Sequence, residues 1–277
     1  MWLIGTMQGR LLPPYEGRFQ AFPAEGWRDE FNHARAAGLY AIEWIYELSH
    51  DTDNPVATDE GIAEIKRLSS ETGVAVRSIC ADYYMQAGLI VAGEPSGERI
   101  EHLKWLLVRA EKLGVIYIVL PFVDQSAVRT PRERNALRNI LGEVLPHAEK
   151  RGVELHLETD LPPHIFADLL AEMNHAMLKV NYDIGNSASL GFNPTEELTR
   201  LRPWLGSVHV KDREAGGGTV RLGTGKADMP TCFRLIEAAG YRRPYIMQVA
   251  RGRDGDEVAW ARGNREFVER QLAQVAE

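Results

Sequence analysis

The sequence predicts an α/β protein with a single domain, residues 1–277, folded as a (β/α)8 barrel. Eight short apolar or β-branched runs recur along the chain, and segments with a helical spacing of apolar residues lie between them. Eight such alternations are the number that closes a parallel sheet into a barrel. The rival is an open doubly wound sheet, but no G-x-G-x-x-G follows the first run, so the nucleotide signature usual in that fold is missing.

The expected strands are the apolar runs themselves. Each has the length of a strand and most follow a Gly or Pro, which favours a strand over a buried helix. They cover residues 2–7, 40–45, 74–80, 115–121, 153–158, 178–183, 205–210 and 244–249.

The segments between the runs have the marks of helices. In the third, the apolar residues Ile100, Leu103, Leu107 and Ala110 follow one another at spacings of three and four, and Gly114 is placed to end the helix. The fourth opens with Thr130-Pro131-Arg132-Glu133, which combines an N-cap, a proline at the first helical position and a capping-box glutamate. Gly152 lies just past its end, and Pro146 predicts a kink in its last turns.

Composition limits the functions that the chain can have. Its 44% hydrophobic and 26% charged residues are typical of a soluble globular protein, and a formal charge of −7 argues against a nucleic-acid partner. Two cysteines favour a reducing compartment over a disulfide framework. The N-terminal apolar run is too short for a signal peptide, and no stretch approaches the roughly 18 apolar residues of a membrane span. We therefore expect a cytoplasmic protein with no membrane association.

Polar residues at the ends of four successive strands carry the functional signal. Side chains alternate along a strand between the barrel interior and the helix layer, and barrel chemistry collects at the carboxyl ends. This parity directs four rim residues inward: Glu158, Asp183, His209 and Gln248. Two carboxylates, an imidazole and an amide oxygen at one point indicate a divalent cation site. The alternative is a hydrogen-bonded polar plug without a metal.

At these residues the chain resembles the xylose isomerase-like TIM barrel superfamily, in particular its sugar phosphate isomerase/epimerase branch. The similarity runs nearly end to end, and its most specific part is the ordered Glu, Asp and His followed by a Gly-rich loop. The matching pieces are Met7-Gln8-Gly9-Arg10, Ile42-Glu43, Leu157-Glu158, Asp183-Ile184-Gly185-Asn186, Val208-His209-Val210-Lys211-Asp212 and Leu222-Gly223-Thr224-Gly225.

The resemblance implies a metal held by Glu158, Asp183, His209 and a residue of the last strand. The ion would be Mn²⁺, Zn²⁺, Mg²⁺ or Co²⁺. The family has a second Glu where this chain has Gln248, and an amide offers a carbonyl oxygen but no charge. We therefore expect weaker metal binding than the family's four-ligand site gives, or none.

The implied reaction is proton abstraction next to the carbonyl of a small sugar or sugar phosphate, giving an enediolate, with Glu158 as the base. Three outcomes stay open: isomerisation by Glu158, epimerisation with Lys211 or Glu43 as an unusual second group, or lost catalysis. The alternatives to an isomerase or epimerase are a non-catalytic or metal-free sugar-binding barrel and a lyase resembling inosose dehydratase.

Other residues are assigned to substrate binding. Glu43 is placed to bind substrate hydroxyls or to orient a ligand, with a buried salt bridge as an equal alternative. Asp82 stands where the family often has a substrate-contacting His. Lys211, Arg213 and Arg10 lie at strand ends where they could meet an anionic substrate, although surface charges are common on such loops. His156 is expected to be an interior histidine with satisfied hydrogen bonds.

Two loops have alternative interpretations. The long segment 9–27, rich in apolar and aromatic residues, is expected to cover the pocket, or else to pack against a neighbouring subunit, which leaves a homo-oligomer open. The glycines at 216–218 and 223–225 favour a flexible loop over a phosphate cradle.

Overall fold

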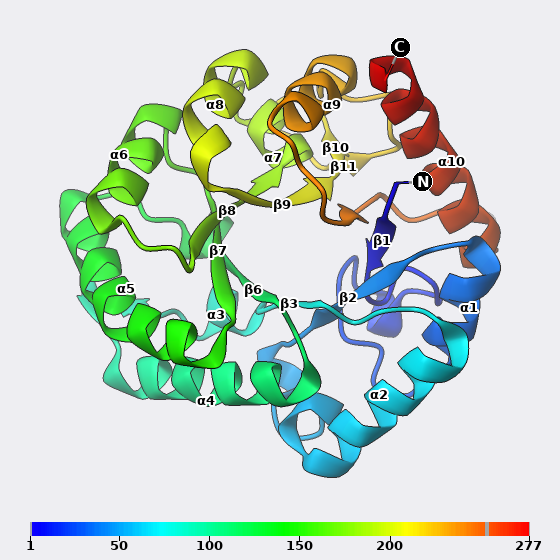
Figure 1. The fold of residues 1–277 in the computed structure, drawn as a ribbon, viewed down its shortest axis with the longest axis horizontal. Helices are drawn as coiled ribbons and strands as arrows, with labels where there is room; N and C mark the ends of the chain where they lie inside the picture. Colours follow the sequence, from blue (N-terminus) through cyan, green and yellow to red (C-terminus); the bar gives the residue numbers. More distant parts are fainter. Residues whose placement is uncertain (1, 253–254, 277) are drawn as a thin grey trace.

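The architecture follows from a closed ring of parallel strands. The structure is a computed structural model that describes residues 2–252 and 255–276. Within them, eight parallel strands close into a barrel in the order β1-β12-β9-β8-β7-β6-β3-β2 (Figure 1). These strands are β1 (Ile4–Met7), β2 (Ala41–Ile45), β3 (Ser78–Cys80), β6 (Tyr117–Phe122), β7 (Glu154–Thr159), β8 (Leu178–Asp183), β9 (Leu205–Val210) and β12 (Tyr245–Met247).

The predicted single-domain (β/α)8 barrel is confirmed, and each expected strand is present. The largest difference is in β3, which begins at Ser78 rather than at residue 74. Ala75 makes an isolated bridge to Ala41, so the chain touches β2 once before the regular ladder begins. The last strand ends at Met247, but the backbone N–H of Gln248 still donates to Val210, which keeps Gln248 in the barrel rim.

A ring of helices covers the outside of the barrel (Figure 1). The longer ones are α1 (Asp29–Ala37), α2 (Asp59–Thr72), α4 (Gly97–Leu113), α5 (Pro131–Arg151), α6 (Pro163–Met173), α8 (Pro194–Leu201), α9 (Met229–Ala238) and α10 (Glu257–Ala276). Short helices lie in the connections between these elements: α3 (Tyr83–Gln86), α7 (Ile184–Ser189), η1 (Tyr15–Gly17), η2 (Leu48–His50), η3 (Pro55–Ala57), η4 (Asp124–Ser126) and η5 (Arg202–Trp204). Among the described residues, no helix combines the length and the apolar character that crossing a bilayer requires.

The expected start and stop signals of these helices act as predicted. In α4 the apolar stripe is buried, and Gly114 ends the helix in the left-handed conformation with φ 88°. In α5, Thr130 accepts from the backbone N–H of Glu133 while the Glu133 side chain accepts from that of Thr130, and Gly152 ends the helix. The helix continues through Pro146 to Arg151.

Two small hairpins lie among the loops at the carboxyl ends of the strands. One joins β4 (Ile90–Val91) to β5 (Glu94–Pro95), and the other joins β10 (Asp212–Arg213) to β11 (Thr219–Val220). The second begins just after β9 and contains the first glycine cluster, residues 216–218. Pairs of this length carry little signal in sequence, because two residues show no periodicity.

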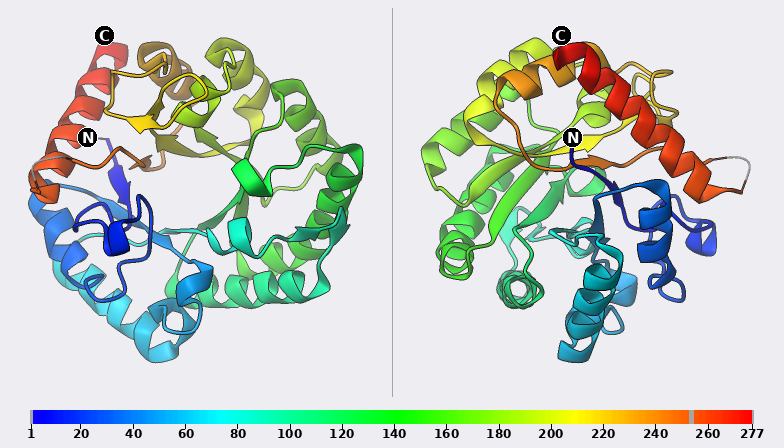
Figure 2. Two further views of the ribbon diagram at one scale, coloured as in Figure 1. Left: turned by 180° about the vertical axis from the view of Figure 1, so that it is seen from behind. Right: turned by 45° about the vertical axis from the view of Figure 1, so that its right-hand side comes forward.

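The long first loop is tied down rather than loose. Glu30 of α1 is fully buried and accepts a 2.6 Å hydrogen bond from the backbone N–H of Gly9. Arg251 donates to the Leu12 carbonyl at 2.8 Å. Glu47 accepts from the backbone N–H of Phe22 at 2.8 Å. In the left panel of Figure 2 this dark blue segment, which carries η1, lies in front of the barrel strands.

Glu30 makes the stability of this fold depend on pH. Burial raises the pKa of Glu30 from 4.5 to about 8, so between these values the unfolded chain releases a proton that the folded chain keeps. The contribution of Glu30 to the free energy of unfolding is therefore fully present below pH 4.5 and is lost as pH rises toward 8. We expect Glu30→Gln to remove this loss, on the order of a few kcal/mol, measured by urea unfolding at pH 5 and pH 8. Glu60→Gln, at an exposed position, is the control, and equal pH slopes in Glu30→Gln and the wild type would contradict the assignment.

Candidate active site

Three strand ends bring their polar side chains to one point. Glu158 lies near the carboxyl end of β7, Asp183 at that of β8 and His209 near that of β9. One atom of each side chain that could bind a metal lies within 4.8 Å of the other two. His209 Nδ1 is 3.3 Å from Glu158 Oε2 and 3.9 Å from Asp183 Oδ2. All three side chains are buried, and the group is of the kind that could hold a metal ion.

Glu43 holds the other side of the His209 ring. Its Oε1 is 2.6 Å from His209 Nε2, and both side chains are fully buried. A histidine that binds a metal commonly donates its second ring N–H to a carboxylate, which fixes the ring and its tautomer. Burial opposes protonation of His209, but the Glu43 and Glu158 carboxylates outweigh it and raise the pKa of His209 to about 10. A metal bound at Nδ1 would have to displace that proton.

Two asparagine amides hold the Glu158 carboxylate. Asn181 Nδ2 donates to Oε2 at 2.9 Å, and Asn186 Nδ2 donates to Oε1 at 2.5 Å. Burial disfavours the charged form of Glu158, but His209, Lys211 and Asn181 together lower its pKa below the usual value. The Glu158 carboxylate is therefore held in its ionised form.

The amides are themselves oriented by donors on their carbonyl oxygens. The Ser207 hydroxyl donates to Asn181 Oδ1 at 2.6 Å, and Arg213 Nη1 donates to Asn186 Oδ1 at 2.8 Å. Because each carbonyl is occupied, each NH₂ group points at Glu158. This arrangement was not predicted from the sequence. Residues 181 and 207, which have the same inward parity as Asp183 and His209, and the motif Asp183-Ile184-Gly185-Asn186 are the signals that could have indicated it.

Gln248 is bound to Lys211 rather than facing the triad alone. Its Oε1 accepts from Lys211 Nζ at 2.7 Å, and the same ammonium lies 3.5 Å from Asp183 Oδ2. Burial raises the pKa of Asp183, with the Lys211 charge opposing and Glu158 adding to the rise. Within the described part of the chain, Asp183 Oδ2 is a buried oxygen with no hydrogen-bond partner. The ligand atoms of Glu158, Asp183 and His209 therefore suit a cation. The Gln248 oxygen already accepts from Lys211.

A cavity of about 270 Å³ adjoins this cluster. Gln20 of the first loop reaches into its wall, where it donates to Asp82 at 2.6 Å and accepts from Gln248 at 3.0 Å. The first loop, which was expected to cover the pocket or to pack against a neighbouring subunit, thus contributes residues to the pocket wall. Other residues that line the cavity are Arg18, Phe19, Glu47, Cys80, Met85, Asp124, Gln125, Glu158, Asn186 and Lys211.

The residues assigned to substrate binding separate into two groups. Asp82 and Lys211 line the cavity, whereas Glu43, Arg10 and Arg213 lie outside its lining and are bonded to other protein groups. Arg10 is buried and donates to the carbonyls of Val249 and Phe19, and burial lowers its pKa to about 9.

His156 lies deeper in the barrel and has partners on both ring nitrogens. Nδ1 is 2.8 Å from Ser207 Oγ, Nε2 is 2.9 Å from Glu154 Oε2, and the ring stacks on Tyr117 at 4.1 Å. This is the satisfied interior histidine that the sequence predicted.

Comparison with known proteins places the chain in a family. Residues 31–271 match the model of the xylose isomerase-like TIM barrel. The chain belongs to the xylose isomerase-like TIM barrel family. The resemblance drawn from the strand-end motifs is thereby confirmed, and the match covers Glu158, Asp183, His209 and Gln248.

Relatives of this xylose isomerase-like barrel include sugar epimerases. L-ribulose-5-phosphate 3-epimerase UlaE of Shigella flexneri serotype 5b is 26% identical over 246 residues, which cover 83% of this chain and 84% of that protein. Among solved structures, L-ribulose 3-epimerase has a TM-score of 0.75 and 19% identity, covering 100% of this chain and 96% of the other. A xylose isomerase-like barrel from Mycobacterium smegmatis in complex with magnesium has a TM-score of 0.68 and 19% identity, covering 100% and 98%. The two structural similarities establish the fold.

Proposed function

We propose that this chain epimerises or isomerises a small ketose by removing a proton from the carbon next to the carbonyl group, with Glu158 as the base. The observation that carries the proposal is the setting of Glu158, which lines the cavity while two oriented amides and His209 hold it ionised. A general base must lie within hydrogen-bond reach of the proton that it removes. The names of the relatives, both 3-epimerases, support the same class of reaction.

We also propose that Glu158, Asp183 and His209 hold a divalent cation, with Mn²⁺, Zn²⁺, Mg²⁺ and Co²⁺ as the candidates. Two observations support this: Asp183 Oδ2 is buried without a hydrogen-bond partner, and Glu43 holds the His209 ring through Nε2. When bound, the cation would polarise the carbonyl and stabilise the negative charge of the enediolate. Binding is expected to be weak, because Gln248 adds no charge and the Lys211 ammonium already lies beside Asp183.

Inversion of a carbon needs a second group that gives a proton back on the opposite face. Of the two groups considered from sequence, Lys211 lines the cavity, whereas Glu43 is fully buried behind His209. We therefore assign this role to Lys211: Glu158 keeps the abstracted proton, the ammonium gives up one of its own, and solvent restores both. Gln248 holds the ammonium at 2.7 Å.

Solvent exchange in D₂O tests these roles separately. Ketopentoses and ketohexoses incubated with the protein and added Mn²⁺ should gain deuterium at the carbon next to the carbonyl and form the epimer, followed by NMR. In Lys211→Met, deuterium should still enter the substrate while epimer formation falls about 100-fold, since only the second proton transfer is lost. Lys226→Met, which removes a lysine outside the cavity lining, should behave as the wild type.

Other results would point to the alternatives. Loss of water from the substrate would indicate a lyase. Binding of a ketose by the wild type without any exchange would indicate a sugar-binding barrel that has lost the chemistry. Equal loss of exchange and epimer formation in Lys211→Met would contradict the assigned role of Lys211.

A further inference from the structure

We infer that the substrate is an uncharged monosaccharide and not a sugar phosphate. This inference rests on the proposed function and concerns the same cavity. A sugar phosphate carries a charge of about −1.5 to −2 at neutral pH and needs free cationic or N–H donors to replace its water. Near the cavity, the two cationic side chains and the glycine-rich loop that could serve a phosphate are engaged with other groups of the protein.

The cavity wall itself is acidic. Among the described residues, four carboxylates line it, from Glu47, Asp82, Asp124 and Glu158, against the two cationic side chains of Arg18 and Lys211. As long as no cation is bound by Glu158, Asp183 and His209, a phosphate dianion in this space would meet more negative than positive charge. The hydroxyls of an uncharged sugar can instead donate to carboxylates and accept from amides.

Both cationic side chains of the wall are paired. Arg18 binds Glu47 with two hydrogen bonds, 2.9 Å from Nη1 and 2.8 Å from Nη2, in the bidentate geometry that a phosphate would otherwise use. Lys211 donates to Gln248 at 2.7 Å and lies 3.5 Å from Asp183. Among the described residues, the donors left to a phosphate are Arg18 Nε, which is buried without a partner, and the remaining N–H groups of Lys211. It could not use the paired guanidinium donors that Glu47 occupies.

The glycine-rich loop after β11 is filled by a side chain of the protein. Successive backbone N–H groups in such loops form concave anion sites. Here the backbone N–H groups of Gly223 and Gly225 both donate to Asp212 Oδ2 at 2.9 Å, and that of Ala227 donates to Oδ1 at 3.1 Å. Asp212 is fully buried. The carboxylate occupies the position that a phosphate would take, so this cradle serves the fold.

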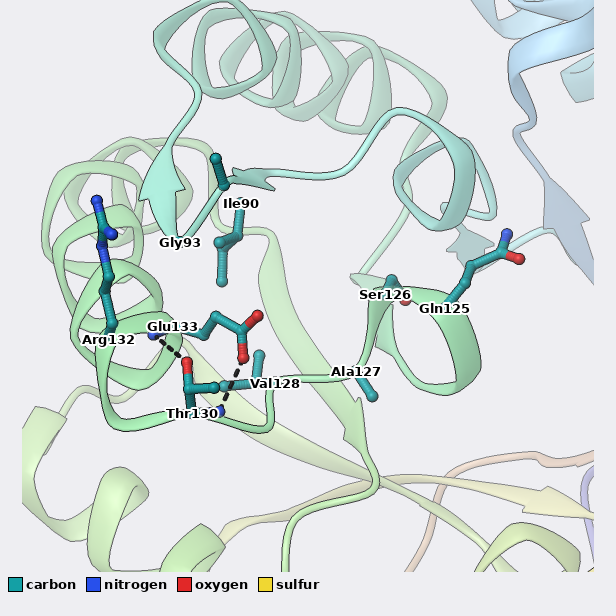
Figure 3. A pocket seen from close by; sticks show the side chains of 10 residues that line it. Ile90, Gly93, Gln125, Ser126, Ala127, Val128, Thr130, Arg132 and Glu133 are labelled. Atoms are coloured by element: carbon teal, nitrogen blue, oxygen red, sulfur yellow. Dashed lines mark hydrogen bonds between the residues drawn. The ribbon is translucent and has the colours of Figure 1, made fainter.

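A neighbouring cavity of about 320 Å³ offers a second place for a phosphate group, because it shares Gln125 with the first (Figure 3). It lies at the N-terminus of α5, where free backbone N–H groups could bind an anion. Figure 3 shows that Thr130 and Glu133 cap each other there. Arg132 points away from this pair and donates to Glu94 at 2.7 Å.

The test compares paired substrates: L-ribulose with L-ribulose 5-phosphate, and D-fructose with D-fructose 6-phosphate. Deuterium exchange gives kcat/KM, and calorimetry gives affinity for the same compounds. In the wild type, the free sugar of a pair should be preferred by about 100-fold, the size expected when a dianion meets like charges. Glu47→Gln frees Arg18 and keeps an acceptor for Phe22, so it should shift the preference about tenfold toward the phosphate.

Glu16→Gln is the matched control, because Glu16 also lies near Arg18, at 4.0 Å, but is exposed and does not hold the guanidinium. Its preference should equal that of the wild type. A wild type that exchanges or binds the phosphorylated member better would overturn the inference while leaving the proposed function standing. If neither member of any pair is exchanged or bound, the proposed function and this inference both fall.

Discussion

Replacing Glu158 with Gln is expected to lower kcat by about 1,000-fold or more, because an amide cannot accept the proton. Gln keeps the size of the side chain and one oxygen that can accept from Asn181 or Asn186. The measurement is deuterium exchange into a ketose at saturating Mn²⁺, which offsets any weakening of metal binding caused by the same change.

Asp160→Asn is the control for this experiment. Asp160 follows Glu158 by two residues at the same rim and accepts from the backbone N–H of Asp124 at 3.1 Å. Removing its charge should change kcat by no more than about threefold, as for a residue without contact to the reacting atoms. Glu158→Gln with wild-type exchange would eliminate Glu158 as the base, and an equal loss in both variants would indicate a general effect of rim charge.

Replacing Gln248 with Glu is expected to tighten divalent cation binding by about 10- to 100-fold. The change adds a carboxylate at position 248, just past the last strand. It also gives the Lys211 ammonium a charged partner that draws this ammonium away from Asp183. The wild type has an amide there whose oxygen is already occupied at 2.7 Å. Calorimetric titration with Mn²⁺ measures the affinity, and the metal-dependent rise in Tm checks it independently.

Gln125→Glu adds the same charge to the same cavity at a residue that donates to the Met85 carbonyl, and it serves as the control. The affinity of Gln125→Glu for Mn²⁺ should differ from that of the wild type by less than about threefold, because solvent and salt screen a charge at the rim. If Gln248→Glu and Gln125→Glu bind Mn²⁺ equally, the effect of the substitution is the overall field of the cavity and residue 248 is not a ligand. Tight stoichiometric binding by the wild type would contradict the weak site proposed here.

Much of the candidate site could be predicted because strand parity is a local rule. Once residues 153–158, 178–183 and 205–210 were taken as neighbouring parallel strands, the side chains of Glu158, Asp183 and His209 had to share one face and one end. The structure pairs Asp183 directly with His209 across β8 and β9. The helix boundaries were equally accessible, since Thr130, Glu133 and Gly152 act on backbone groups within a few residues of themselves.

The partners of these side chains could not be predicted in the same way. Arg213, assigned to an anionic substrate from its place on the rim, orients Asn186 instead. Gln20 enters the pocket from a loop whose path depends on Glu30, Glu47 and Arg251, three residues far apart in sequence. Nothing local to residue 20 indicates that it will meet Asp82 and Gln248.

By itself, the sequence determined the barrel, its strand ends and the inward residues of the rim, because periodicity and capping are properties of adjacent residues. Only the tertiary structure decided which charges are free to act. Glu47 neutralises Arg18, Asp212 fills the glycine loop and Gln248 holds Lys211, and in each contact the folded chain brings together residues that are not adjacent in sequence. The reason is that these hydrogen bonds depend on distance in space, which local patterns of neighbouring residues do not fix.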